Sequence, residues 1–279
     1  MKKVTVNIEG PQHPQITQRM SELYKELFES IPLNLDKKEL SRFFAMKGNN
    51  YDSALPKIMI VGRSTNGWTE INEETSEDFA LAAGNEMLSG KGFHWIDKDN
   101  KTSKYINEKN ELKTYNINRS AFWRLIKLIV EKVAPWENQY KQLDPKLTEQ
   151  NRKELKDKFM QRWFEQIVWT NLYPIAPKHS GNATEKIKTV QTDICGELLL
   201  EQIKFYKPTY IIFITDWDYW FGNFENFFPN VKKIGSSDKD NIVGYGDING
   251  IKTVVTVRPD RRKNKPNEEK MTMDIIDAM

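Results

Sequence analysis

Short apolar runs alternate with longer amphipathic segments through most of the chain. The runs predict buried strands at residues 57–63, 167–171, 209–215 and in the segment that ends at Arg258, while helices are predicted at 119–133, 147–166 and 184–206. Continuous apolar strands that alternate with helices indicate a sheet covered on both faces. We therefore expect an α/β fold, a three-layer α/β/α arrangement with a mainly parallel central sheet.

The N-terminal region and one long polar stretch stand apart from this alternation. In residues 14–31 apolar positions recur every three or four residues, which predicts an amphipathic helix packed on its own domain. We expect residues 1–56 to form an N-terminal helical segment packed on the core, and residues 57–279 to form the α/β domain. Within it, residues 69–118 are polar and mixed, and predict an insertion or flap. An Asn-Gly pair at 249–250 predicts a tight hairpin turn.

Polar or glycine-containing segments directly follow the predicted strands. They cover residues 62–67, 171–177, 215–217 and 258–262. If the strands are parallel neighbours, their carboxyl ends meet at one edge of the sheet, where open α/β sheets bind ligands. A glycine such as Gly62 lets a ligand approach the backbone, while Asn66 and Asn171 each offer a donor and an acceptor. The sequence therefore predicts a binding site at this edge.

Composition narrows the classes of protein to which this chain can belong. Of the 279 residues, 38% are hydrophobic and 29% are charged, and Cys195 is the only cysteine. One cysteine excludes an internal disulfide framework and a four-thiolate metal or iron–sulfur site. The three histidines are scattered, so we expect no metal, and we expect no cofactor. Without an apolar run of about 18 residues or a signal-peptide pattern, we expect a cytoplasmic protein with no membrane partner.

Positive charge is concentrated after the last predicted strand. The net charge is only +3, but a basic cluster comprises Arg258, Arg261, Arg262, Lys263 and Lys265. Such a run is commonly a solvated loop. Its place at the expected binding edge also fits contact with a phosphate backbone. The cluster thus leaves two interpretations, a solvated loop or a nucleic-acid contact.

Several segments, in their order along the chain, resemble the uracil-DNA glycosylase superfamily. The stretches TNLYPIAPKHSGNATEKI and ICGELLLEQIKFYKPTYIIFIT are similar to its thermostable iron–sulfur members. VGRSTNGW stands where the family has its water-activating loop, RSAFWRLI resembles the segment that supplies a base-stacking ring, and TVRPDRR stands where the family has a His-Pro-Ser loop. The weak matches together cover roughly residues 57–265. Because this chain has a single cysteine, the cluster of its iron–sulfur relatives must be absent.

The resemblance implies DNA as partner and gives several residues a binding role. Asn171 would read the polar edge of a flipped base, and Phe122 would stack on that base. The base and sugar would lie against Gly62 and the backbone of Arg63, Ser64 and the two residues that follow. The phosphate backbone would face Arg258 and the basic residues Arg261, Arg262 and Lys263.

The catalytic positions depart from the family pattern. The residue that corresponds to the acid of the water-activating loop is Ser64, and Arg258 replaces the histidine of the second loop. Asn66 or Asp260 would then handle the water. Arg258 would stabilise the departing base anion, since a guanidinium stays protonated. Either the chemistry has moved to these residues, or the site binds without cleaving.

We therefore expect a uracil-DNA glycosylase-like protein that binds a nucleobase in DNA and hydrolyses its N-glycosidic bond. The alternatives are a non-catalytic DNA- or protein-binding member of the same fold, and an unrelated α/β enzyme that acts on a free nucleotide. Two residue-level alternatives also stay open. Arg63 either contacts a ligand or pairs with a nearby carboxylate, and the aromatic residues between Trp217 and Phe221 either pack the domain or form a stacking platform for single strands.

Overall fold

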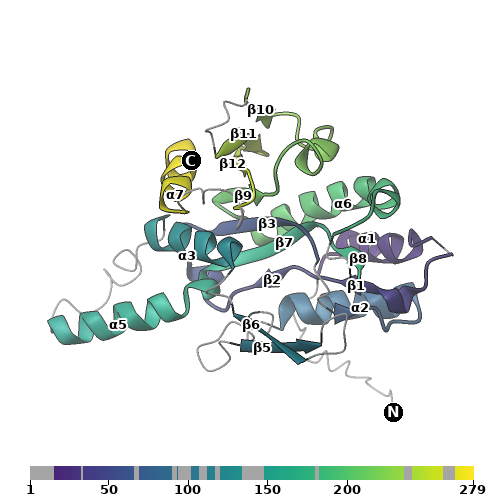
Figure 1. Ribbon diagram of the computed structural model, residues 1–279, viewed down its shortest axis with the longest axis horizontal. Coiled ribbons are helices and arrows are strands. Elements are labelled where there is room, and N and C mark those ends of the chain that lie inside the picture. Colours follow the sequence, from purple (N-terminus) through teal and green to yellow (C-terminus); the bar gives the residue numbers. More distant parts are fainter. Residues whose placement is uncertain are drawn as a thin grey trace, which may run out of the picture.

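The computed structural model has a mixed α/β fold (Figure 1). It describes residues 16–32, 34–65, 69–89, 93, 102–106, 112–116, 120–133, 148–179, 182–235, 241–259 and 268–279. Within these ranges no helix is both long enough and apolar enough to cross a membrane.

The main sheet has seven strands in the order β10-β11-β12-β9-β3-β7-β2. The four central strands, β3 (Ile58–Ser64), β7 (Ile167–Tyr173), β9 (Tyr210–Ile214) and β12 (Ile251–Thr256), run parallel. The outer strands, β2 (Met46–Lys47), β10 (Lys232–Lys233) and β11 (Ile242–Ile248), pair antiparallel. The α/β class is therefore confirmed, but the sheet is mixed, because its outer strands reverse direction.

Side chains of β3, β7 and β9 alternate between two hydrophobic cores. Met59 and Val61 point into a core shared with α1 (Gln18–Glu29) and α6 (Glu185–Tyr206), whereas Ile58 and Ile60 point into a core shared with α3 (Ala121–Val133) and α7 (Glu268–Ala278). In Figure 1, α3 and α7 gather at the left and α1 and α6 at the right. Continuous apolar strands are explained by this burial on both faces.

Residues 1–56 contain strands that the sequence did not predict. After α1, β1 (Leu40–Arg42) forms a small sheet with β4 (Thr69–Glu70) and β8 (Ile175–Pro177), and β2 joins the main sheet. Short 3-10 turns lie at Lys37–Glu39, Tyr51–Ser53, Trp163–Gln166 and Phe221–Phe224. Strands of two or three residues are too short to show an alternating pattern.

The long polar stretch at 69–118 is partly built into the core. Its helix α2 (Ser76–Leu88) packs on α1 and buries Phe79, Ala80, Ala83 and Met87. Strands β5 (Thr102–Ile106) and β6 (Leu112–Asn116) form a separate hairpin, and helix α5 (Glu149–Gln161) lies further along the chain. Helix α2 is therefore part of the packed body of the protein.

The predicted hairpin turn between β11 and β12 is confirmed. Asn249 and Gly250 both adopt positive φ, 54° and 78°, as a tight two-residue turn between twisted strands requires. The carboxylate of Asp247 accepts a hydrogen bond from the Gly250 N–H at 3.0 Å and closes the turn. This hairpin returns the chain to β12, whose carboxyl end leads to Arg258.

Candidate functional site

The carboxyl ends of β3, β7, β9 and β12 lie along one edge of the sheet, because these four strands are parallel neighbours. We call this edge the rim. Two backbone hydrogen bonds join neighbouring strand ends there: Thr65 donates to the Tyr173 carbonyl at 3.3 Å, and Asp216 donates to the Thr256 carbonyl at 2.9 Å. The segments that follow the four predicted strands therefore start from a common edge.

At the rim, Gly62 of β3 and Asn171 of β7 are direct register partners. A Cβ atom on Gly62 would lie 2.3 Å from Oδ1 of Asn171 and 3.4 Å from Nε1 of Trp169. Only glycine leaves room for the amide of Asn171 to lie over β3 in this way. The close approach explains why an otherwise apolar strand contains a glycine at this position.

The amide of Asn171 is buried and incompletely bonded. The residue is 7% exposed, and its Nδ2 has no hydrogen-bond partner among the residues that the structure describes. An unsatisfied buried donor costs about 1–3 kcal/mol, and native proteins keep few of them without a reason. A carbonyl oxygen of a ligand would satisfy this donor.

Aromatic rings adjoin the Asn171 amide on the same face of the sheet. Trp169 precedes Asn171 by two residues in β7 and so points to the same side. The half-buried ring of Phe122, on α3, lies 6.1 Å from the Trp169 ring and 5.1 Å from the Trp123 ring between centroids. The structure therefore brings Gly62, Asn171 and, through Trp169, Phe122 into one region.

Arg63, the next residue of β3, is held by the strand beside it. Its Nε donates to the Thr215 carbonyl at 2.7 Å, its guanidinium forms an ion pair with Asp216, and it lies 5.2 Å from the centroid of the Trp220 ring. Burial, and secondly the charge of Arg258, lower the pKa of Arg63 to about 10, which leaves it protonated at neutral pH. The interpretation that Arg63 pairs with a carboxylate is confirmed.

Asp216 is the rim residue that sequence reasoning did not assign. Its backbone is left-handed, with φ 67°, a conformation that aspartate tolerates better than most residues. One carboxylate oxygen pairs with Arg63 of β3, and the other accepts the Arg258 N–H at 3.0 Å. Asp216 thus connects the ends of β3 and β9 with the segment after β12. The sequence feature that could have identified Asp216 is its place as an acid directly after a buried strand.

Ser64 and Arg258, the two positions that depart from the family pattern, have different surroundings. Ser64 Oγ accepts the Ala183 N–H at 3.1 Å and donates to the Thr65 carbonyl at 3.3 Å, which ties β3 to the segment before α6. The side chain of Arg258 is exposed at the rim. Five other predicted site residues, Asn66, Asp260, Arg261, Arg262 and Lys263, lie outside the described residues.

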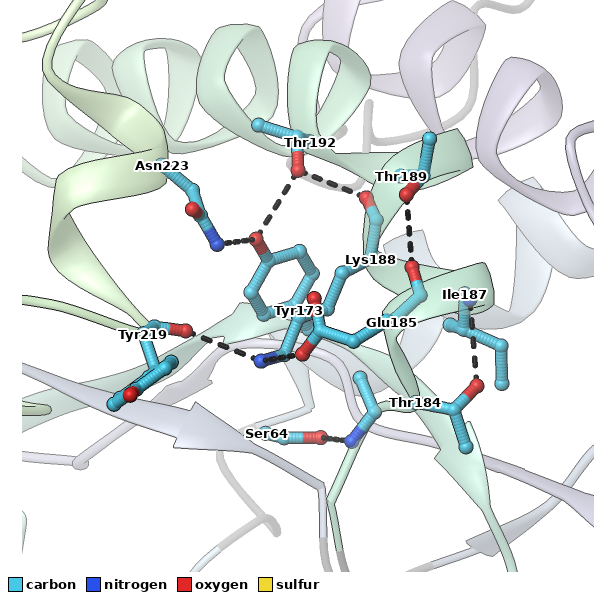
Figure 2. Close-up of polar contacts among 11 residues, drawn as sticks. Ser64, Tyr173, Thr184, Glu185, Ile187, Lys188, Thr189, Thr192, Tyr219 and Asn223 are labelled. Atoms are coloured by element: carbon cyan, nitrogen blue, oxygen red, sulfur yellow. Dashed lines mark hydrogen bonds and ion pairs between the residues drawn. The ribbon is translucent and has the colours of Figure 1, made fainter.

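The first turn of α6 carries a buried cation beside the rim. Lys188 is 5% exposed, and its Nζ donates to the carboxylate of Glu185 at 2.8 Å and to the Tyr219 carbonyl at 3.1 Å (Figure 2). The same Nζ lies 4.1 Å from the centroid of the Trp220 ring. Two cations, Lys188 and Arg63, therefore contact one indole.

The polar side chains drawn in Figure 2 also join α6 to β7 and to the turn after β9. Tyr173 shares a hydrogen bond with Thr192 at 3.1 Å and accepts one from Asn223 Nδ2 at 3.0 Å. Burial raises the pKa of Tyr173, so its hydroxyl keeps its proton at neutral pH. These contacts hold the α6 side of the rim in place.

The described part of the chain contains no group of three His, Cys, Asp or Glu side chains that could hold a metal ion. Cys195 is buried within α6, and burial raises the pKa of its thiol well above the ordinary range. A thiol in that state is a poor nucleophile. The chemistry that the rim can offer rests on an amide, aromatic rings and guanidinium groups.

We expect Gly62→Ala to displace the Asn171 amide, since the new methyl would meet Oδ1 at 2.3 Å. The free energy of unfolding should fall by about 1–2 kcal/mol in urea denaturation, and the side-chain amide signals of Asn171 should shift in a ¹H–¹⁵N spectrum. Gly235→Ala is the matched control, because nothing lies within 4 Å of the methyl it would add. Equal stability and unchanged amide signals in the two variants would contradict the close approach.

No protein-family model matches this chain, and a search of curated proteins finds no match either. The candidate site is therefore defined by its own geometry: a buried amide over a glycine, aromatic rings beside it, and an acid that ties three strand ends together.

Proposed function

We propose that this chain is a uracil-DNA glycosylase-like protein that binds a nucleobase of DNA at the rim. The observation that carries the proposal is the Asn171 amide, buried over Gly62 with its Nδ2 unbonded within the described residues. An amide next to aromatic side chains suits a flat, polar-edged ligand, because the ring stacks while its edge is read by hydrogen bonds. Phe122 is the proposed stacking residue.

The unbonded donor of Asn171 calls for a base that presents an acceptor. Nδ2 requires an acceptor, and a ring carbonyl is the acceptor that uracil, hypoxanthine and xanthine share. Such a base must leave the helix to reach a buried amide, as in other proteins that act on single bases. The exposed Arg258, with Arg261, Arg262 and Lys263, would contact the phosphates beside the extruded nucleotide.

The architecture supports the resemblance on which this proposal draws. Four parallel strands form the centre of the sheet, and buried residues of α1 and α6 contribute to the core on one face while those of α3 and α7 contribute to the core on the other. This arrangement is compatible with a three-layer fold of the glycosylase type. Ligand binding at the carboxyl ends of the strands is the general rule for open α/β sheets.

The proposed reaction is hydrolysis of the N-glycosidic bond. Water forms a bond to C1′ of the sugar, the bond from C1′ to the base nitrogen breaks, and its electron pair leaves with the base. Asn66 or Asp260 would position the water. Its proton would pass to the Asp260 carboxylate, or to solvent if Asn66 holds the water. Arg258 would balance the negative charge on the departing base.

Binding without cleavage is the second candidate, and two contacts favour it. Ser64 stands where the family has its acid, and its hydroxyl is engaged by the Ala183 N–H. Asp216 already pairs with Arg63 and accepts the Arg258 N–H. These two rim side chains are therefore occupied by the structure itself, which fits a protein that recognises a base and leaves it attached.

The test uses single- and double-stranded oligonucleotides that carry one uracil, hypoxanthine or xanthine. We expect Asn171→Ala and the isosteric Asn171→Asp to weaken binding by about 10- to 100-fold, because a base-reading amide is worth about 1–3 kcal/mol. Gln202→Ala controls for the loss of a buried amide, since Gln202 bonds Thr170 and Tyr24 on the face of the sheet opposite to Asn171. Affinity is measured by fluorescence anisotropy and folding by urea denaturation.

The outcomes separate the candidates. Free base released by the wild type supports hydrolysis, whereas tight binding without release at enzyme excess supports the non-catalytic protein. Equal affinities for wild type and both Asn171 variants would overturn base recognition. If the chain binds none of the oligonucleotides but shows a thermal shift with a free nucleotide, the result favours an α/β enzyme that acts on a free nucleotide.

A further inference from the structure

Tyr219 is an exposed aromatic residue among three buried aromatic neighbours. Its neighbours Trp217, Trp220 and Phe221 pack into the core, which confirms the packing interpretation for these three rings, but Tyr219 is 77% exposed. An exposed aromatic side chain forgoes the stabilisation that burial provides, and it leaves a flat ring face available for stacking.

The backbone that carries Tyr219 is firmly held. Trp220 N–H donates to the Trp217 carbonyl at 3.2 Å, which closes a turn around Asp218 and Tyr219. The carbonyl of Tyr219 itself accepts a hydrogen bond from the buried ammonium of Lys188 (Figure 2). A charge-assisted bond from a buried cation fixes the peptide more strongly than a neutral bond would. The ring is thus presented from a rigid turn.

This turn adjoins the rim. It begins at Asp216, which pairs with Arg63 and accepts the Arg258 N–H. Trp220, at its other end, contacts the guanidinium of Arg63. The negative charge of Asp218 beside Tyr219 is balanced by an ion pair with Lys233. The Tyr219 ring is therefore exposed at the same rim as the guanidinium groups of Arg63 and Arg258.

We propose that Tyr219 is a stacking platform for an unpaired base next to the nucleotide bound at the rim, so that the preferred partner is single-stranded or locally opened DNA. The proposal rests on the proposed function, because it places a second base beside the one that Asn171 reads. Every base has a flat face, so such a platform adds affinity without reading sequence. Arg258, exposed beside the turn, would lie against the connecting phosphate.

The experiment measures whether Tyr219 and the flanking base act together. The probe is a single-stranded oligonucleotide with a central uracil, made with 2-aminopurine or with an abasic spacer on either side. We expect Tyr219→Ala to lower affinity about 10-fold and to abolish the fluorescence quenching of 2-aminopurine on one side, whereas Tyr219→Phe keeps both. Tyr245→Ala is the matched control, a 56% exposed tyrosine on β11 that should change neither.

The abasic probes exclude a merely structural effect. The wild type should lose about 10-fold in affinity when the stacked base is replaced by the spacer. Tyr219→Ala should bind the two oligonucleotides with equal affinity. If the spacer lowers the affinity of the wild type and of Tyr219→Ala by the same factor, the proposal that Tyr219 is a stacking platform is wrong. If Asn171→Ala still weakens uracil binding in that case, the proposed function survives without it. If Tyr219→Ala weakens binding and Asn171→Ala does not, the result supports the Tyr219 platform and contradicts base recognition by Asn171.

Discussion

Three buried groups are together expected to lower the free energy of unfolding by about 5 kcal/mol between pH 8 and pH 11. Burial raises the pKa of Cys195, Tyr24 and Tyr206 far above their ordinary values, so these groups stay protonated in the folded chain. The unfolded chain ionises its thiol near pH 9 and its tyrosines near pH 10. Their stabilising effect is therefore complete below pH 8 and is lost as the pH rises from the unfolded toward the folded pKa values. Each group loses about 1.4 kcal/mol per pH unit beyond its unfolded pKa.

Two variants show which residues cause this fall in the free energy of unfolding. The free energy is measured by urea denaturation at intervals from pH 8 to pH 11. Cys195→Ala should flatten the part of the curve below pH 10, because it removes the group that ionises first. Tyr206→Phe should flatten the upper part at no cost at neutral pH, since the Tyr206 hydroxyl has no hydrogen-bond partner in the described parts of the chain. A flat curve for the wild type would contradict the burial of all three groups.

The rim was the most predictable part of the molecule. Strands β3, β7 and β9 are buried on both faces, so their sequences are continuous apolar runs that end abruptly in polar residues. Neighbouring parallel strands must finish at the same edge, so the sequence predicted that the segments starting at Gly62 and Asn171 would meet there. That these two residues are register partners is a finding of the structure. The turn at Asn249 was equally readable, because few residue pairs tolerate two positive φ angles.

What the sequence could not show are contacts between side chains that are distant along the chain. Arg63 was a candidate ligand contact, yet it pairs with Asp216, which lies 153 positions later. Ser64 was a candidate for the base site through its backbone, and the structure adds that its hydroxyl accepts the Ala183 N–H. Such pairings depend on the exact end of each strand, and the two-residue strand β2 was missed for a related reason, because so short a segment carries no period.

The same contacts divide the rim into two functional parts. Arg63, Ser64 and Asp216 bond to the protein itself and fix where the strand ends lie. Asn171 keeps an unused donor, and Tyr219 an exposed ring, within the described residues. Altering a group of the second kind should change binding directly. Altering a group of the first kind should change stability, and should change binding only through the shape of the rim. Stability and binding measurements therefore report on different residues of the rim.

Replacing Asp216 with alanine is expected to lower the free energy of unfolding by about 2–4 kcal/mol. The change leaves the half-buried guanidinium of Arg63 without its carboxylate and the Arg258 N–H without its acceptor. It also places alanine in a left-handed conformation that strains it. Asp216→Asn should cost about half as much, because asparagine keeps an acceptor and tolerates positive φ.

The control for Asp216→Ala is Asp218→Ala. Asp218 lies two positions after Asp216, and its exposed carboxylate pairs with Lys233. An exposed ion pair contributes about 0–1 kcal/mol, so this variant should unfold in urea almost as the wild type does. Because Asp216 joins β3, β9 and the segment after β12, its loss should also weaken uracil-oligonucleotide binding even under conditions in which the variant stays folded. If Asp216→Ala is as stable as Asp218→Ala, then this acid does not hold the strand ends together, and the site cannot depend on it for its shape.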